Sequence, residues 1–253
     1  MLYTEKDSWV RTLAYMFLAV SSLAILFAFK GGSSPYFAQI SPSDNPTPSP
    51  LQSPPTAPVS SQKKEKAKDS EAEAVKEKMK KAQQKLTASG LFKGTVDGVY
   101  TDSFQQSIAA FQRLKGLPDN GEFTEPTYEL LMQTSNIKQE IDMLERLVYA
   151  ESRGEPYVGK VAVAAVVLNR VSSEQFPDTI KEVIFEKNAF SVIQNGKLPT
   201  SKNLESKKAV QDALFGQDPS KGSLYFYNPS ISTSQWIFSR KTQVVIDNHV
   251  FAI

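Results

Sequence analysis

YVGKVAVAAVVLNRV, residues 157–171, is the stretch that decides the fold, because it is apolar on nearly every face when it is drawn as a helix. A helix that is hydrophobic all round has no face to offer to water and must be enclosed by other elements. Gly154 and Pro156 separate this helix from the one before it. The sequence therefore predicts a domain built around one buried central helix.

The preceding segment, IDMLERLVYAESRGEP at residues 141–156, places a carboxylate among apolar side chains. Spacings of three and four residues put Ile141, Leu144, Val148 and Glu151 on one helical stripe. A glutamate there loses hydration, which raises its pKa, as a general acid for a glycosidic oxygen requires. The alternative is a glutamate at a frayed helix end that reaches solvent or pairs with Arg153. Taken alone, these residues favour the alternative.

Downstream of the central helix the pattern changes from helical to extended. Residues 179–185 and 203–215 have the pattern of amphipathic helices, and Gly216 ends the second one. In SLYFYNP, alternation sends Tyr225 and Tyr227 to one face, and TQVVIDNHVFAI supplies partner strands. We therefore expect an α+β fold, in which residues 138–253 form a mainly helical domain with a small antiparallel sheet.

Residues 70–136 have the pattern of a smaller, separate domain. One helix starts at a capping box on Ser70 and stops at Gly90, a second starts near Ser103, and Thr124 caps a third. The side chains expected to point inward from the second and third helices are Phe104, Ile108, Phe111, Leu114, Tyr128 and Leu131. Turns at Asp97-Gly98 and Asp119-Asn120-Gly121 join the helices. The sequence therefore predicts a compact three-helix domain.

The N-terminal segment, residues 1–30, has the composition of an export signal. TLAYMFLAVSSLAILFAF at residues 12–29 carries no charge, and its length fits both a short membrane-spanning helix and a long signal-peptide core. We favour the retained anchor over cleavage near Ala38. Residues 31–69 form an expected linker, first rich in proline and serine and then in charge. The protein is therefore expected to be exported, either membrane-anchored or secreted.

The residue inventory excludes several catalytic classes. The chain has no cysteine, so a thiol nucleophile is impossible, and a single histidine leaves a zinc hydrolase without its usual imidazole ligands. That histidine, His249, has no evident partner constellation, and we interpret it as structural. A net charge of +2 is too small to indicate a nucleic-acid binder. We therefore expect chemistry that runs on carboxylates, without a metal or another cofactor.

The sequence from about Glu73 to Gln133 resembles the small three-helix peptidoglycan-binding domain. The features that match are the Asp97-Gly98 turn, Phe111-Gln112, Gly116-Leu117 and Gly121. This chain has Thr101 where the family usually has a glycine after the aromatic residue, here Tyr100. The resemblance implies that residues 70–136 bind peptidoglycan, and a purely structural helical spacer is the alternative.

The sequence from about Ile141 to Phe251 resembles the SleB-type cell-wall hydrolases, the family of the spore cortex-lytic enzymes. The matching blocks are YAESRGEP at 149–156, VAVAAVVLNRV at 161–171, AFSVI at 189–193, LYFYNP at 224–229, Trp236, and HVF at 249–251. The resemblance implies a lysozyme-like catalytic domain in which Glu151 is the catalytic acid. Ala150 and Ser152 stand where the family more often has glycine and alanine.

The same resemblance implies a lytic transglycosylase that cleaves peptidoglycan between N-acetylmuramic acid (MurNAc) and N-acetylglucosamine (GlcNAc). Glu151 would protonate the leaving oxygen and then take the proton of the muramic 6-hydroxyl, which leaves 1,6-anhydromuramic ends. The residues that the resemblance implies for the glycan groove are Phe190, Ser191, Tyr225, Tyr227, Asn228 and Trp236. Core packing is the alternative for Phe190 and Trp236. Glu155 is expected to orient its neighbours.

Two other functions stay open at this point. A hydrolytic muramidase would need a second carboxylate beside the acid. A non-catalytic protein could instead bind peptidoglycan with both domains and tether the envelope to the membrane through residues 1–30. The glycan strands of peptidoglycan are the expected partner in every case. The substrate could be a vegetative wall or a spore cortex, whose cleavage would belong to germination.

Overall fold

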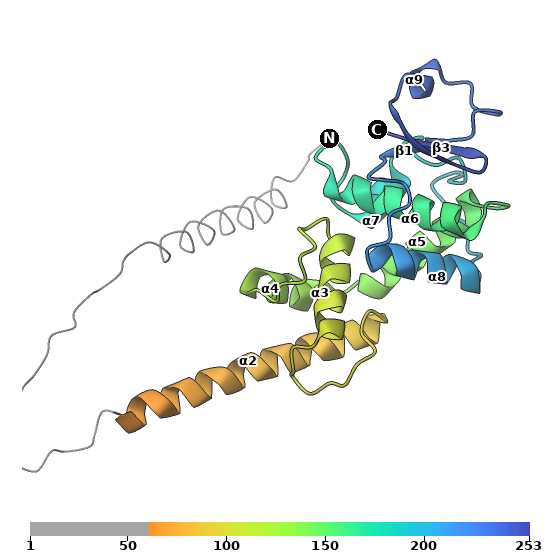
Figure 1. The fold of residues 1–253 in the computed structure, drawn as a ribbon. Helices are drawn as coiled ribbons and strands as arrows, with labels where there is room; N and C mark the ends of the chain where they lie inside the picture. Colours follow the sequence, from red (N-terminus) through yellow and green to blue (C-terminus); the bar gives the residue numbers. More distant parts are fainter. Residues whose placement is uncertain (1–60) are drawn as a thin grey trace, which may run out of the picture. The chain divides into compact units, whose positions relative to one another are not determined.

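The computed structural model describes residues 61–253, with side chains from Ser70 onward, and the expected export signal and proline-rich tract lie outside them. The elements in chain order are α2 (Ser61–Ser89), α3 (Asp102–Leu114), α4 (Glu125–Gln133), α5 (Ile137–Glu151), α6 (Tyr157–Ser172), α7 (Ile180–Phe185), α8 (Leu204–Leu214), β1 (Tyr225–Tyr227), α9 (Gln235–Phe238), β2 (Thr242–Ile246) and β3 (His249–Ala252) (Figure 1). Residues Ala72–Ile253 form one compact unit. No helix of the described chain is long and apolar enough to cross a bilayer.

Helix α2 begins at Ser61, so the helix start expected at Ser70 is wrong. The sequence SQKKEKAKD at residues 61–69, which precedes the expected start, has no proline or glycine and is rich in lysine, which favours helix. The capping box expected at Ser70 therefore lies inside the helix. Gly90 follows the last helical residue with a φ of 86°, as the predicted stop requires.

Helices α3 and α4 complete the predicted three-helix domain. Thr101, and not Ser103, caps α3, because Thr101 has an extended backbone and its hydroxyl accepts a hydrogen bond from the N–H of Phe104. Thr124 caps α4 as predicted. The side chains of Phe104, Ile108, Phe111, Leu114 and Leu131 are buried as predicted, and that of Tyr128 is half-buried.

The predicted turn at Asp97-Gly98 is held by the fully buried side chain of Gln83 from α2. Its Oε1 accepts hydrogen bonds from the N–H groups of Asp97 (3.0 Å) and Gly98 (2.8 Å), and its Nε2 donates to the carbonyl of Val99 (3.0 Å). Gly98 has a φ of 77°, and a Cβ there would lie 2.6 Å from the carbonyl oxygen of Lys76. Only glycine fits this position without strain.

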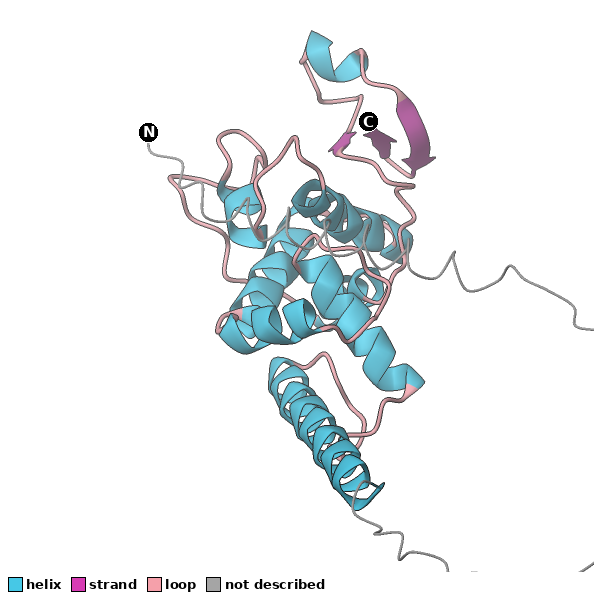
Figure 2. Ribbon diagram, turned by 90° about the vertical axis from the view of Figure 1, so that its left-hand side faces the viewer, coloured by secondary structure: helices cyan, strands magenta, loops and turns pink. Residues whose placement is uncertain are grey.

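The second half of the unit is built around α6, which is the predicted buried helix. It packs against α5, α7, α8 and β1, and this surround explains why nearly all of its residues are buried. Thr179 and Asn203 cap α7 and α8 at the predicted positions. Figure 2 shows that helices make up most of the described chain and that the strands form one small sheet. The α+β fold expected from the sequence is confirmed.

The sheet has the order β1-β3-β2, and both pairings are antiparallel. Phe226 of β1 pairs with Phe251 of β3, and their ring centroids lie 6.0 Å apart. Tyr225 and Tyr227 flank Phe226 and point to the opposite face, as the alternation predicted. The short helix α9, between β1 and β2, was not expected, because four residues are too few to show a helical period.

The three-helix domain and the second half of the unit pack directly on each other. Helix α3 lies against α6 and α8. At its end, Nζ of Lys115 lies 2.6 Å from Oε2 of Glu140 in the first turn of α5. The guanidinium of Arg113 donates to the carbonyl of Leu214 at the end of α8. These contacts cross the boundary between the two expected domains.

Candidate active site

Glu151 is the last residue of α5, and its side chain is partly buried. Its Oε1 accepts a hydrogen bond of 3.2 Å from the backbone N–H of Val192. Burial raises the pKa of the carboxyl above its ordinary value, while the Val192 hydrogen bond and the positive charges of His249 and Arg170 act against that rise. The carboxyl is thus desolvated by burial, although the residues taken alone favoured a glutamate that reaches solvent. The alternative partner, Arg153, lies over the ring of Tyr149 instead.

Arg170 lies near the end of α6 and is only 6% exposed. Its Nε donates a hydrogen bond of 2.7 Å to the carbonyl of Leu224, just before β1. The guanidinium carbon lies 5.0 Å from the ring centroid of Phe176, 5.1 Å from that of Phe190 and 5.7 Å from that of Tyr225. A cation so placed interacts favourably with the ring faces. Arg170 therefore connects the central helix with β1, with the segment before α7, and with the loop whose backbone binds Glu151.

His249 begins β3 and faces a buried carboxylate. Its Nδ1 lies 3.0 Å from Oε1 of Glu155, whose side chain is 4% exposed. The rings of Phe226 and Phe251 pack on the imidazole, with centroids 5.5 and 6.4 Å away. The expectation that His249 has no partner constellation is therefore wrong. The sequence concealed the pair because the two residues are far apart along the chain and meet only when the sheet packs on α6.

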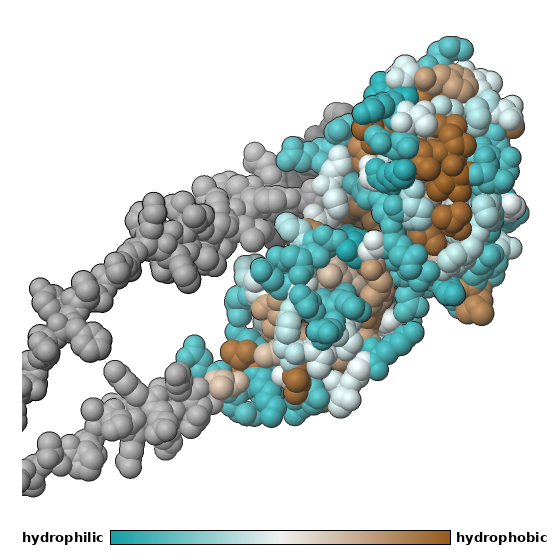
Figure 3. All heavy atoms as spheres, viewed as in Figure 1, coloured by the Kyte–Doolittle hydropathy of each residue, from teal (hydrophilic) through white to brown (hydrophobic). Residues whose placement is uncertain are grey.

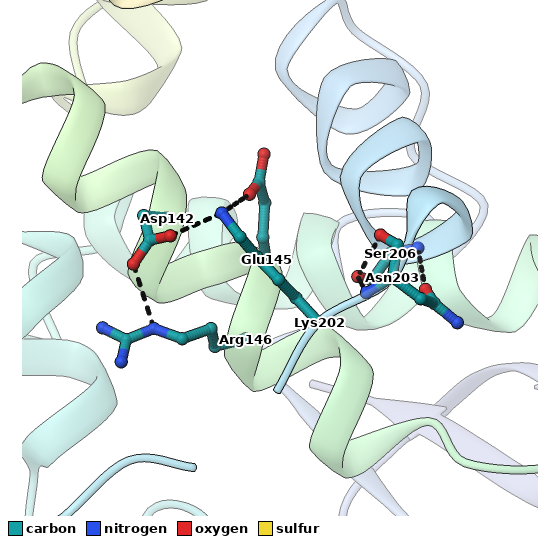
Figure 4. Close-up of polar contacts among 6 residues, drawn as sticks. All are labelled: Asp142, Glu145, Arg146, Lys202, Asn203 and Ser206. Carbon is teal, nitrogen blue, oxygen red and sulfur yellow. Dashed lines mark hydrogen bonds and ion pairs between the residues drawn. The ribbon is translucent and has the colours of Figure 1, made fainter. Parts of the chain in front are cut away.

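The loop between α7 and α8 carries the backbone donor to Glu151 and is fixed at both ends of its course. Phe190 is 4% exposed and packs against Phe226 at 6.3 Å, whereas its neighbour Ser191 is exposed. Figure 4 shows Lys202, just before α8, between two carboxylates of α5. Its Nζ lies 2.5 Å from Oδ1 of Asp142 and 2.6 Å from Oε2 of Glu145. These contacts hold the loop against the helix that carries Glu151.

The chain around β1 and α9 presents aromatic side chains beside this loop. Trp236 is 52% exposed, and its ring packs edge-on against Tyr225 at 5.1 Å. Tyr227 packs in the same way against Phe238 at 5.4 Å, and Asn228 follows, half-buried. Figure 3 shows apolar surface gathered over the region of the sheet. Exposed apolar surface that is gathered in one place often marks a binding site.

The candidate residues thus fall into two groups. Tyr225 contacts Arg170, which acts electrostatically on Glu151, and Phe190 packs on the same guanidinium. Tyr227, Asn228 and Trp236 lie further along the β1–α9 segment. Within residues 61–253, no group of three or more His, Asp or Glu side chains is arranged to hold a metal ion.

Sequence reasoning missed two residues of this site, Arg170 and the backbone of Val192. A signal for Arg170 was present, because a charged side chain in a helix that is apolar all round must find a buried role. No sequence signal identifies a particular backbone N–H as the donor to a carboxylate, since every residue except proline carries one.

Comparison with known proteins assigns both halves of the unit. The sequence model of the family described as Cell Wall Hydrolase matches residues 154–252, and that described as putative peptidoglycan binding domain matches residues 75–131. The first match begins three residues after Glu151. The order of the two matches is the order expected from the sequence.

Several known proteins are similar to this chain over long segments. A spore cortex-lytic enzyme of Bacillus cereus is 34% identical over 207 residues, which cover 67% of this chain and 80% of the relative. A spore cortex-lytic enzyme of Halalkalibacterium halodurans is 48% identical over 112 residues, 44% of this chain and 34% of that protein. The solved catalytic domain of the germination-specific lytic transglycosylase SleB from Bacillus anthracis is 47% identical and covers 47% of this chain and 96% of its own, with a TM-score of 0.44.

Proposed function

Because the chain belongs to the family of the spore cortex-lytic enzymes, we propose that it degrades peptidoglycan by cleaving the MurNAc-GlcNAc bond with Glu151 as the acid. The observation that carries this proposal is the environment of Glu151. Burial raises the pKa of its carboxyl, while a backbone N–H and the guanidinium of Arg170 act to stabilise the ionised form. A group that must first give and later take a proton needs both influences.

In the reaction we propose, one carboxyl serves twice. Neutral Glu151 donates its proton to the glycosidic oxygen as the bond between C1 of MurNAc and that oxygen breaks. The carboxylate then accepts the proton of the 6-hydroxyl of the same MurNAc as O6 bonds to C1. Intramolecular attack gains from proximity and needs no activated water. The product ends in 1,6-anhydromuramic acid, and the enzyme is returned with Glu151 neutral.

The surroundings of two other carboxylates, Glu155 and Asp218, favour transglycosylation over hydrolysis. A hydrolase needs a second carboxylate about 5 to 9.5 Å from the acid that is free to act on water or on the sugar. Glu155 is buried and faces His249. Asp218 accepts hydrogen bonds from Ser220 and Gly222 in its own loop and from Asn169 of α6. Glu155 fits the orienting role expected of it better than that of a nucleophile.

Carbohydrate binding belongs, in this proposal, to two regions. Residues 70–136 form the peptidoglycan-binding domain, and residues 138–253 form the catalytic domain. In the latter, Tyr225, Tyr227, Asn228, Trp236 and the exposed Ser191 line the glycan groove, while the buried Phe190 supports it from below. Residues 1–30 hold the protein at the membrane or direct its export, so that it faces the cell wall.

The test compares full-length wild-type protein with Glu151→Gln and, as a matched control, Glu182→Gln, a glutamate exposed on α7. Mass spectrometry of the muropeptides released from purified peptidoglycan should show anhydromuramic ends with the wild type and the control. Glu151→Gln should release none, because an amide cannot cycle a proton, yet should still sediment with insoluble peptidoglycan. Activity of Glu151→Gln near that of the wild type would place the acid elsewhere. Reducible, hydrated ends would make the enzyme a muramidase, and sedimentation without cleavage by the wild type would support the tether.

A further inference from the structure

The strongest feature that the proposed reaction leaves unused is the buried guanidinium of Arg170. It is almost entirely enclosed, yet within residues 61–253 the ion pairs of the structure do not include it. Its one directed hydrogen bond runs to a backbone carbonyl, that of Leu224. Buried charges are normally paired, because an unpaired one loses its hydration without compensation. We therefore expect the unpaired buried charge of Arg170 to have a function at the candidate active site.

The contacts of Arg170 reach the loop that binds Glu151 and two further segments. The guanidinium lies over Phe190, two residues before the Val192 N–H that binds Glu151, and over Tyr225 of β1. It also lies over Phe176, in the segment between α6 and α7. A lysine could not reproduce this arrangement, because only a planar group with several N–H donors can stack on rings and hold the carbonyl at the same time.

We propose that Arg170 is a positioning residue for Glu151, which orders the loop that binds the acid and supplies a permanent positive charge that acts on it. This inference rests on the proposed function of Glu151. It gives the central helix a part in catalysis, whereas the sequence resemblance placed no site residue on that helix. Arg170 acts through Glu151 and need not touch the substrate.

The charged groups around Arg170 and Glu151 determine the effect of the Arg170 charge on the acid. Glu151 is faced by His249 from β3 and by Arg170 from α6, and His249 is itself paired with Glu155. Arg170 is faced by Glu186 beyond α7, by Tyr225 of β1 and by Glu151 of α5. Burial alone would make Glu151 a weak acid, and the charge of Arg170 opposes that effect. It also stabilises the carboxylate in the interval before the 6-hydroxyl proton arrives.

The test is the pH dependence of the initial rate of muropeptide release by full-length protein at low substrate concentration. The alkaline limb of this profile reports the ionisation of the acid in the free enzyme. In Arg170→Met the lost charge should move the limb to higher pH, and the rate at the optimum should fall by about tenfold to a hundredfold, as expected when a catalytic group is displaced. In Arg170→Lys the limb should stay in place while the rate falls, because charge is kept and stacking is lost.

Arg153→Met is the matched control, since Arg153 is an exposed arginine two residues from Glu151 and should leave both limb and rate unchanged. An alkaline limb that does not move in Arg170→Met, with the rate lowered equally at all pH values, would reduce Arg170 to a structural residue. If Arg170→Met does not fold, a limb displaced in Arg170→Lys would overturn the charge role by itself. Activity in Glu151→Gln would instead overturn the proposed function and leave the packing role of Arg170 untouched.

Discussion

Replacing Lys115 by methionine should destabilise the protein strongly, because it leaves a buried carboxylate without its partner. The side chain of Lys115 is 14% exposed and that of Glu140 is 3% exposed, and their charged atoms lie 2.6 Å apart. Removing one member of a buried ion pair lowers stability by about 3 to 5 kcal/mol. Glu140 keeps a hydrogen bond of 3.2 Å from Nδ2 of Asn136, which places the expected loss near the lower end, at about 3 kcal/mol. Urea unfolding followed by circular dichroism measures the difference.

The chain offers a matched control for this experiment. Lys78 and Glu125 also form a close pair, at 2.7 Å, but both side chains are exposed, at 41% and 54%. Lys78→Met should therefore leave the unfolding midpoint nearly unchanged, because solvent screens exposed pairs. The double variant Lys115→Met/Glu140→Gln should recover most of the loss, since no buried charge remains. A single variant as stable as the wild type, or a double variant no better than the single, would refute this account of the interface.

Three further predictions test the site and the fold. Burial raises the pKa of Glu151 from its ordinary value of 4.5, so above that pH the native state binds more protons than the unfolded state, and the stability of the wild type falls as the pH rises. Glu151→Gln should therefore melt at a higher temperature than the wild type at pH 7 but not at pH 4. Equal differences in melting temperature at both pH values would contradict the desolvation. Trp236→Ala should lower the rate of glycan cleavage and change stability by no more than about 1 kcal/mol, whereas Phe190→Ala should lower stability by about 3 to 5 kcal/mol. Denaturant unfolding and cleavage rates of both variants distinguish a substrate-binding residue from a core residue. The reverse pattern would exchange the roles of Trp236 and Phe190. Gly98→Ala should lower stability by about 1 to 3 kcal/mol, because it strains a residue at a φ of 77°, and unchanged denaturant unfolding would show that the turn can rearrange.

The sequence predicted those parts of the fold that depend on residues close together along the chain. The continuous apolar run in α6 predicted burial on every face, and Thr124, Thr179 and Asn203 predicted helix starts because their side chains accept hydrogen bonds from free N–H groups. The stripe that ends at Glu151 allowed a desolvated carboxyl but left a frayed, solvent-reaching glutamate the favoured interpretation, and burial decided between the two. Where two residues could serve equally, as Thr101 and Ser103 at α3, the backbone conformation decided.

The interactions that sequence could not foretell join residues distant along the chain. Glu155 and His249 meet only because the sheet packs on α6 through β1 and brings β3 to the segment before that helix, and no periodicity links them. The contact of Arg170 with Leu224 depends on where β1 lies against the central helix. The early start of α2 has a different cause, since a lysine-rich stretch has both the composition of a solvated linker and a high helix propensity.

The close packing of α3 on α6 and α8 fixes the distance between the peptidoglycan-binding domain and the catalytic domain. Only Thr134, Ser135 and Asn136 separate α4 from α5, and the side chains of Arg113 and Lys115 fasten the two halves together. A wall-binding domain on a flexible linker lets its enzyme reach many bonds around each point of attachment, at an effective concentration set by the linker. Here attachment and cleavage would instead be separated by the invariant span of a single folded body. The enzyme would measure its cut from the place where it holds the wall, and it would have to release that hold before it could reach the next bond.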